Sequence, residues 1–285
     1  MSESTFDANA YKAAQRHEWG QSATGWKHYW ETWERGAQHV NDRLVELAEI
    51  QLGHQVLDIA SGLGEPAFTA ARKVGAVGKV VGIDIAPEML AMARAEAEAL
   101  GLSHVEFREM DAEAPDLPVH SFNAILCRFG LMFLPHLSTA LTKLHELLTP
   151  GGRFAAAVWG QPAQVPAINM PMRIIRQRRH LAPPPAGVPG PFSLADEQLL
   201  REQFQQAGFT HIHTEHLTVT LEYISPEIFI EERLATSANT RLLLADASEA
   251  ERAEILRAIK EELHTYTEVD GLIRLRNALL CIVGW

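Results

Sequence analysis

The chain has 285 residues, of which 47% are hydrophobic and 21% charged, and its 36 acidic against 25 basic side chains give a formal net charge of −11. This acidic balance disfavours non-specific binding to nucleic acid, and no run approaches the roughly 18 unbroken apolar residues of a membrane-spanning helix. The two cysteines, Cys127 and Cys281, lie in apolar runs and are typical of reduced core residues. Because the start of the chain has neither a basic segment nor an apolar run, we expect no secretory signal and a cytoplasmic protein.

Residues 1–50 are expected to form a helical lid. Four of the six tryptophans lie in this segment, at Trp19, Trp26, Trp30 and Trp33. Their rings either pack on the core or contact a ligand through stacking and cation–π interactions. We expect a mixture, and the best candidates for substrate contacts are Trp26, Tyr29 and Trp30, which we place on adjoining positions of one helix.

Residues 51–160 alternate short β-rich runs with helical stretches, a pattern typical of parallel β-α-β units. The expected strands are 56–59, 79–84, 105–107, 122–127 and 153–159, and the expected helices are 87–100 and 137–148. In the first of these helices, the expected apolar face is Met89, Leu90, Ala93, Ala97 and Leu100. The fourth strand is almost continuously apolar, which suits a strand covered on both faces. The segment therefore predicts an α/β core.

The pattern changes after residue 160. Residues 161–192 are rich in proline and are expected to form a connector or cap around one basic helical turn, 173–179. The core continues over 193–224, with a helix that Ser193 caps and that reaches Ala207, followed by a strand. Residues 225–270 are expected to be a helical cap insertion in two segments separated near 246–248. The final core strand lies within 271–285.

The most informative stretch is the loop after the first strand. It places a strand, then a tight turn with Gly62 and Gly64, then the start of a helix whose free N–H groups point toward a ligand. About 20 residues further on, Asp84 ends the second strand, where a carboxylate can accept hydrogen bonds from both hydroxyls of a ribose. A third acidic position, Asp111, follows the third strand. Three acidic side chains at carboxyl strand ends indicate a ligand site rather than ordinary turns.

Residues 62–67 also fit a dinucleotide fingerprint, so the loop alone leaves two interpretations open. Asp58 lies in the first strand just ahead of the turn, where its carboxylate would repel an anionic pyrophosphate. A cationic amino group near the loop explains this carboxylate better. S-adenosylmethionine carries both an ammonium and a sulfonium and has no phosphate.

At this point the sequence resembles the class I S-adenosylmethionine-dependent methyltransferases. The segment Asp58-Ile-Ala-Ser-Gly-Leu-Gly64 is similar to their first motif, with Ala60 in place of its first glycine, which we expect to be tolerated at a negative φ. Residues 122–125 and 148–152 match later motifs, and the resemblance covers roughly residues 53–160. The small-molecule branch, similar to ubiquinone/menaquinone biosynthesis methyltransferases, resembles the chain most.

The resemblance implies a Rossmann-like α/β fold with a seven-stranded, mostly parallel sheet whose last strand is antiparallel, plus a helical cap. It also implies S-adenosyl-L-methionine as cofactor, with Asp58 near its methionine end, Asp84 on the ribose and Asp111 on the adenine amine. The implied cofactor-binding residues are Asp58, Ala60, Ser61, Gly62, Gly64, Asp84, Ile85, Met89, Asp111, Ala112, Arg128 and Phe129.

The region after the fourth strand carries neither the Asn-Pro-Pro-Tyr type motif of amide and adenine methylation nor the metal-binding carboxylates of catechol enzymes. We therefore expect metal-independent transfer by in-line displacement to nitrogen, carbon or oxygen of a small organic acceptor, such as a natural product. A monomer or homodimer is expected, with no nucleic acid partner. The alternatives are an NAD-dependent oxidoreductase and a catalytically inactive cofactor-binding regulator.

On the acceptor side, Trp159 ends the fifth strand and is expected to face the substrate, together with Met132. Phe129, Met132 and Phe133 are equally compatible with core packing. His28 and His136 are weak candidates for a general base, since a lone histidine is more often structural.

Two further clusters have a simpler explanation than ligand binding. His211, His213 and Glu215 share one strand face and superficially resemble a metal triad, but an exposed polar face explains them. The basic residues Arg173, Arg176, Arg178 and Arg179 could bind an acidic acceptor, although a solvated helix face explains them better.

Overall fold

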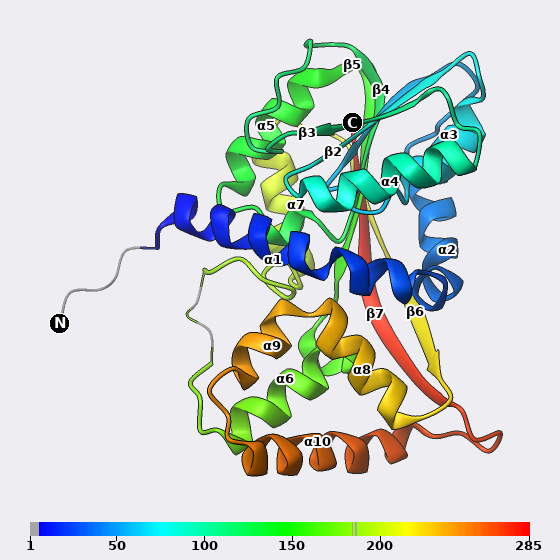
Figure 1. The fold of residues 1–285 in the computed structure, drawn as a ribbon. Coiled ribbons are helices and arrows are strands. Elements are labelled where there is room, and N and C mark those ends of the chain that lie inside the picture. Colours follow the sequence, from blue (N-terminus) through cyan, green and yellow to red (C-terminus); the bar gives the residue numbers. More distant parts are fainter. Residues whose placement is uncertain (1–5, 184, 186) are drawn as a thin grey trace.

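The computed structural model describes residues 6–183, 185 and 187–285. Its strands are β1 (Gln55–Ile59), β2 (Lys79–Asp84), β3 (Val105–Glu109), β4 (Phe122–Arg128), β5 (Leu148–Trp159), β6 (Ile212–Tyr223) and β7 (Ile273–Gly284). Within these described ranges they form one seven-stranded sheet in the order β3-β2-β1-β4-β5-β7-β6 (Figure 1). β7 runs antiparallel to β5 and β6, whereas all the other pairs are parallel. The expected Rossmann-like α/β sheet with an antiparallel last strand is confirmed.

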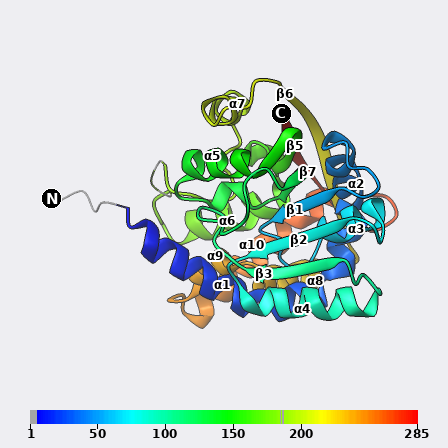
Figure 2. The ribbon, with the colours of Figure 1, turned by 90° about the horizontal axis from the view of Figure 1, so that it is seen from above.

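Helices cover both faces of this sheet. They are α1 (Ala8–His28), α2 (Trp30–Leu47), α3 (Ala67–Val74), α4 (Pro87–Ala99), α5 (Leu137–Leu147), α6 (Pro166–Arg178), α7 (Glu197–Gln206), α8 (Pro226–Thr236), α9 (Ala238–Leu244) and α10 (Glu249–Leu263). α2 and α3 contact each other on one side of the sheet, and α5 and α7 contact each other on the other side (Figure 2). No helix among the described residues is long and apolar enough to cross a membrane.

The apolar face of α4 shows how local sequence sets the packing. Met89, Leu90, Ala93 and Ala97 are buried as expected, and Pro87 occupies the first turn, where a missing N–H does no harm. Leu100 is wrongly included in that face, because the helix ends just before it and its side chain is 48% exposed.

The expected lid over residues 1–50 divides into two helices with different roles. α2 packs against β5, β6 and α3 and buries Val40 and Leu44, so it belongs to the core. Only α1 crosses the open edge, where it contacts α4 on one side and α8 on the other. Tyr29 lies between the helices with φ −97° and ψ 10°, so placing Trp26, Tyr29 and Trp30 on one helix was wrong. Residues 1–5 lie outside the described part of the chain.

The cap is a cluster of four helices, α6, α8, α9 and α10, below the sheet in Figure 1. α6 is a full helix of 13 residues that contains Pro171, so the expected single turn at 173–179 was wrong. Pro171 removes one backbone hydrogen bond of the helix, and the burial of Met170, Ile174 and Ile175 compensates for this loss. The insertion over 225–270 has a second break at Ser237, whose hydroxyl accepts from the Thr240 N–H and caps α9.

Asp196, rather than Ser193, caps α7. The Asp196 carboxylate accepts from the N–H groups of Gln198 and Leu199, whereas the Ser193 hydroxyl donates to the carbonyl oxygen of Met132. Ser193 therefore fixes the end of the connector against the loop after β4.

Candidate active site

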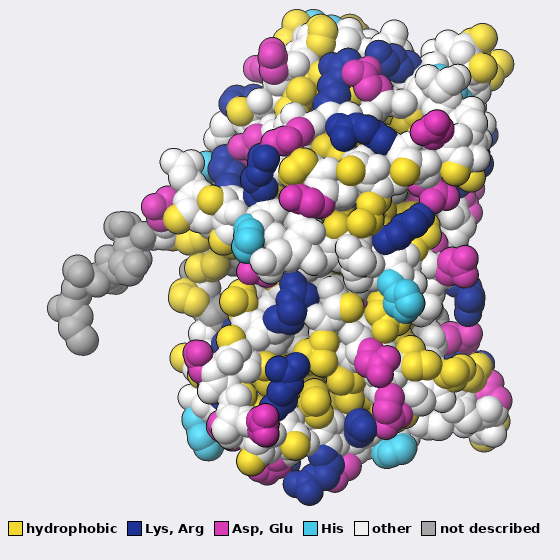
Figure 3. All heavy atoms as spheres, viewed as in Figure 1, with side chains coloured by type: hydrophobic (Ala, Val, Ile, Leu, Met, Phe, Trp, Pro, Cys, Tyr) yellow, Lys and Arg dark blue, Asp and Glu magenta, His cyan; other side chains and the backbone are white. Residues whose placement is uncertain are grey.

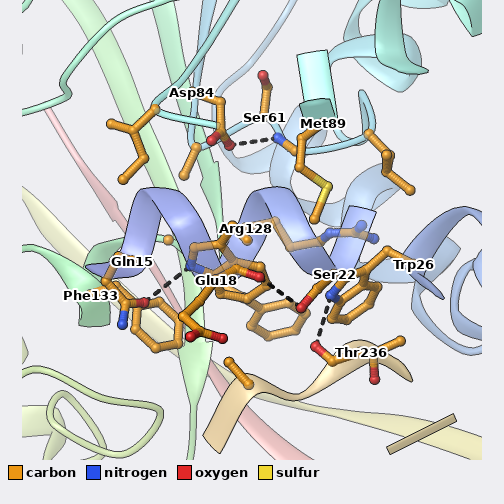
Figure 4. A pocket seen from close by; sticks show the side chains of 18 of the residues that line it. Gln15, Glu18, Ser22, Trp26, Ser61, Asp84, Met89, Arg128, Phe133 and Thr236 are labelled. Atoms are coloured by element: carbon orange, nitrogen blue, oxygen red, sulfur yellow. Dashed lines mark hydrogen bonds between the residues drawn. The ribbon is translucent and has the colours of Figure 1, made fainter. Parts of the chain in front are cut away.

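One pocket opens between the carboxyl ends of the parallel strands and the cap. α1 crosses it, with Asp84 and Met89 on the sheet side and Thr236 on the cap side (Figure 4). Two hydrogen bonds tie α1 to the cap: Trp26 Nε1 donates to the Thr236 carbonyl oxygen over 3.1 Å, and Arg241 Nη2 donates to Ser22 Oγ over 2.7 Å. The pocket is therefore lined jointly by the sheet edge, by α1 and by the cap.

The loop after β1 is built on three residues in the left-handed region. Ala60 has φ +54°, Gly62 +51° and Gly64 +112°. The expected negative φ of Ala60 was wrong, and a β-carbon there carries strain that a glycine would not. At Gly64 a β-carbon would lie 2.2 Å from the Phe68 ring, so the glycine is required by packing as well as by backbone conformation.

Two buried oxygens, one near the end of β1 and one in the loop after it, have no partner among the described residues. Asp58 Oδ2 accepts from the Ala67 N–H over 3.0 Å, but Asp58 Oδ1 and Ser61 Oγ make no hydrogen bond. Burial raises the pKa of Asp58 well above its ordinary value, and the nearby Arg128 charge and the Ala67 amide only partly oppose this shift. Orphaned buried polar atoms are costly, so the loop fits a ligand that brings a cation or donors to it.

Asp84 is held at the end of β2 by two backbone amides. Its Oδ2 accepts from the Gly62 N–H over 2.9 Å (Figure 4), and its Oδ1 accepts from the Ala86 N–H over 2.9 Å. Burial is the main cause that raises the pKa of this carboxyl, and the backbone amides of Ala86, Gly62 and Ile85 oppose it. Asp84 lines the pocket, so its carboxylate can accept from a pair of neighbouring hydroxyls there.

Asp111 is engaged by α1. Lys12 Nζ donates to Asp111 Oδ2 over 2.7 Å and to Glu113 Oε2 over 2.9 Å. Two more ion pairs join α1 to the sheet half of the protein, between Arg16 and Glu109 and between Lys27 and Glu96. Ion pairs between basic side chains of α1 and acidic side chains of the sheet half thus hold α1 over this side of the pocket.

Arg128 is paired with Glu34 of α2. Its Nη2 and Nη1 donate to Glu34 Oε1 over 2.6 Å and Oε2 over 2.9 Å, and both side chains are almost buried. The guanidinium charge at the end of β4 is therefore compensated by the protein itself.

Six aromatic rings form a continuous wall of the pocket. Their order in space is Phe133, Trp19, Trp26, Trp33, Trp159 and Phe129. Phe129 and Trp159 are stacked at 3.9 Å between ring centroids, with 7° between their planes. Such a wall favours flat, apolar or aromatic ligands.

The structure brings most of the expected site residues together. Those that line the pocket are Ala60, Ser61, Gly62, Asp84, Ile85, Met89, Asp111, Ala112, Arg128, Phe129, Trp26, Trp30 and Trp159. Trp30 packs beside Leu63 and Met89, on the sheet side. Asp58 and Gly64 lie beneath the loop rather than at its surface.

Four expected residues, Met132, Tyr29, His28 and His136, lie outside the pocket. Met132 is buried in the core, as its alternative interpretation allowed, and Tyr29 contacts the His28 ring at the junction of α1 and α2. His136 precedes α5 and donates its N–H to Glu113. None of these four lines the pocket, so the structure places neither histidine as a base there.

Several lining residues were missed by sequence reasoning. They are Lys12, Gln15, Glu18, Trp19, Ser22, Trp33 and Glu34 on α1 and α2, and Ile168, Arg233, Thr236, Ser237, Ala238 and Asn239 of the cap. Trp33 and Glu34 lie close in sequence to the expected tryptophans, and this proximity could have indicated that they line the pocket. No local pattern marks the cap residues.

The other two clusters have structural partners. Glu215 pairs with Arg43 over 2.7 Å, and no group of three or more potential metal ligands occurs in the described part of the chain. Arg173 pairs with Glu262 and Arg178 with Glu254, both on α10. On the face drawn in Figure 3, basic and acidic side chains alternate and do not gather by sign.

Comparison with known proteins agrees with this geometry. Residues 56–152 match the family model described as a methyltransferase domain. The matched residues run from β1 into β5 and include the loop after β1, and the sheet has the order of a class I, Rossmann-like fold.

Two relatives are similar over the core. Aklanonic acid methyltransferase of Streptomyces sp. is 44% identical over 113 residues, which cover 40% of this chain and 51% of the relative. Demethylmenaquinone methyltransferase of Thermus thermophilus is 37% identical over 136 residues, covering 48% and 60%. The chain thus spans between half and two thirds of these relatives. The YcgJ protein of Bacillus subtilis shares the fold, with a TM-score of 0.59 and 19% identity over 87% of this chain and 97% of that one.

Proposed function

We propose that the protein transfers a methyl group from S-adenosylmethionine to a small organic acceptor with a flat, conjugated skeleton. When bound, S-adenosylmethionine supplies an electrophilic methyl group. The observation that supports this proposal most strongly is the Asp84 carboxylate, which lines the pocket at the end of β2 and is held there by the Gly62 and Ala86 amides. Carboxylates at this loop favour a cationic ligand over a pyrophosphate.

In this proposal the residues at the sheet edge hold the cofactor. Asp84 accepts from the ribose hydroxyls, Ile85 and Met89 line the adenine slot, and Asp111 and Ala112 contact the adenine edge. Asp58 and Ser61 serve the amino group of the methionine part. These roles follow the strand ends at which the side chains lie.

The aromatic wall holds the acceptor and excludes water. A methyl transfer needs alignment of the nucleophile more than it needs an acid or a base, so a tight apolar slot contributes mainly by orientation. Trp26, Trp30 and Trp159 are the expected substrate contacts that lie in the pocket, and Trp33 joins them. The two relatives are named for methylation of aklanonic acid and of demethylmenaquinone. These names support an acceptor of this class.

Calorimetric titration with S-adenosylhomocysteine and with NADH tests the cofactor assignment. We expect S-adenosylhomocysteine to bind with micromolar affinity and NADH not to bind. Binding of NADH alone would favour an oxidoreductase and overturn the proposal.

Transfer of radiolabelled methyl from S-adenosylmethionine to a panel of quinones and aromatic polyketide acids then tests the reaction. Labelled product with at least one of them is expected. Binding without any transfer across the panel would favour a cofactor-binding regulator.

A further inference from the structure

The cap contributes one cation to the pocket that the proposed cofactor site does not use. Arg233 on α8 lines the pocket, and only 7% of its side chain is exposed. Its Nη2 donates to Glu232 Oε1 and to Thr236 Oγ1. Its Nε is buried without a partner, and no hydrogen bond from Nη1 occurs among the described residues.

The other two basic side chains that line the pocket are already compensated. Lys12 contacts two carboxylates, and Arg128 uses two nitrogens on both oxygens of Glu34. Arg233 differs because a single nitrogen carries all its contacts. Its whole Nη1 amino group is left without a hydrogen-bond partner among the described residues.

The ion pair with Glu232 does not occupy the unpaired Nη1 group of Arg233. The Glu232 side chain is fully buried and does not line the pocket, so Arg233 lies between that carboxylate and the cavity. Glu232 Oε1 also accepts from Trp33 Nε1 over 2.7 Å. The pair therefore fixes the guanidinium in place at the wall of the pocket, with Nη1 free of a partner among the described residues.

The aromatic wall passes next to this guanidinium. Arg233 Cζ lies 5.3 Å from the ring centroid of Trp33, which is itself 6.3 Å from the ring of Trp159. A flat ligand against Trp33 would bring a substituent within reach of Arg233. Charge-assisted hydrogen bonds to a fixed guanidinium favour a carboxylate over a neutral group of the same shape.

We propose that Arg233 is a specificity-determining residue that binds an anionic oxygen of the acceptor, a carboxylate or an ionised enol. This proposal rests on the proposed function, since it assumes that the cap half of the pocket receives the acceptor. Five carboxylates also line the pocket: Glu18, Glu34, Glu65 and Asp111 are paired with Arg241, Arg128, Arg72 and Lys12, and Asp84 accepts from backbone amides. Among the described lining residues of the cap, Arg233 is the one that carries a charge.

The test compares 2-naphthoate with 2-naphthamide, which share size and shape but differ in charge. Binding is followed by quenching of tryptophan fluorescence, with and without S-adenosylhomocysteine. We expect the wild-type protein to bind the acid at least about ten-fold more tightly than the amide. Equal affinities, or no saturable binding of either probe, would overturn the proposal.

Variants separate contact from net charge. Glu232→Gln/Arg233→Gln removes both charges of the buried pair together, and the preference should fall below about two-fold. Arg252→Gln is the control, because Arg252 is an exposed arginine of α10 in the same cap and does not line the pocket, and it should keep the preference. A preference that survives in the double variant, or that is lost equally in the control, would contradict a role for Arg233.

The wild-type comparison needs no substitution, so it can overturn the proposal even if the double variant does not fold. Calorimetry with S-adenosylhomocysteine reports on the proposed function separately. If calorimetry shows no binding of S-adenosylhomocysteine while the protein still prefers naphthoate, the cofactor assignment is refuted and the anion site is not.

Discussion

Arg128 at the end of β4 and Glu34 on α2 form a bidentate ion pair, with N–O distances of 2.6 and 2.9 Å. The pair joins a strand of the cofactor-side sheet to a helix that the sequence had assigned to the lid. Because both side chains are nearly buried, water cannot take the place of the partner for either charge.

Glu34→Gln should therefore destabilise the protein by about 3 kcal/mol, because it leaves the Arg128 charge buried and uncompensated. Urea unfolding measures this change. Glu261→Gln is the control: its ion pair with Arg257 is exposed and 4.0 Å long, so the loss should stay below about 0.5 kcal/mol. Equal effects of the two variants would mean that burial does not matter for the Glu34 pair.

Asp84→Asn should weaken binding of S-adenosylhomocysteine by about ten-fold or more, since charge-assisted bonds to the ribose become neutral ones. Asp116→Asn, an exposed carboxyl without a hydrogen bond or ion pair in the described structure, should leave the affinity unchanged. Isothermal titration calorimetry compares the three proteins. Wild-type affinity in Asp84→Asn would remove this residue from the site.

Asp58 gives a pH dependence with a definite sign. Burial raises its pKa in the folded protein, so above the ordinary value the folded state binds more protons than the unfolded one. Stability without ligand should then fall as pH rises from the unfolded pKa toward the raised one. Urea unfolding from about pH 4 to pH 7 should show this slope in the wild type and a smaller one in Asp58→Asn.

The same group should give ligand binding the opposite trend. An ammonium near Asp58 favours the ionised carboxylate, so affinity for S-adenosylhomocysteine should increase from about pH 5 to pH 7. Asp58→Asn should bind more weakly and with a flatter profile. A wild-type profile that is already flat would separate Asp58 from the amino group of the ligand.

Ala60→Gly should stabilise the protein by about 1 kcal/mol, because φ is +54° at this residue and glycine adopts that conformation without strain. The control is Ala95→Gly on the exposed face of α4, which should destabilise by about 1 kcal/mol. Thermal unfolding distinguishes the two signs. Destabilisation by both substitutions would show that the Ala60 methyl contributes more through packing than it costs through strain.

Lys12→Met should speed dissociation of S-adenosylhomocysteine about five-fold, because it removes two of the ion pairs that hold α1 over the pocket. Stopped-flow tryptophan fluorescence measures the rate. Lys73→Met changes an exposed lysine on α3 and should have no effect. An unchanged rate in Lys12→Met would mean that α1 does not limit release.

The sheet and the loop after β1 could be predicted because their signals are local. An apolar strand, a turn that contains glycine and a helix start lie within a dozen residues, and Asp84 follows at a fixed position. The conformation of Ala60 could not be predicted in this way. Its φ is set by the surrounding loop, and alanine normally avoids that region.

The far half of the pocket could not be predicted, because its contacts join distant parts of the chain. Trp33 bonds Glu232 from 199 residues away, and Glu34 bonds Arg128 from 94 away. α6 was missed for a different reason. Pro171 predicts a break, but burial of its neighbours in the cap stabilises the helix through it.

Three of the four cap helices, α8, α9 and α10, connect β6 to β7, two strands of 12 residues that stay in register from Ile212 opposite Gly284 to Tyr223 opposite Ile273. These helices are inserted between the distal ends of this ladder. A different insertion could replace them without changing any residue pair of the sheet. The ladder thus makes α8, α9 and α10 an exchangeable module, so that the pocket wall they form can vary while the sheet stays the same.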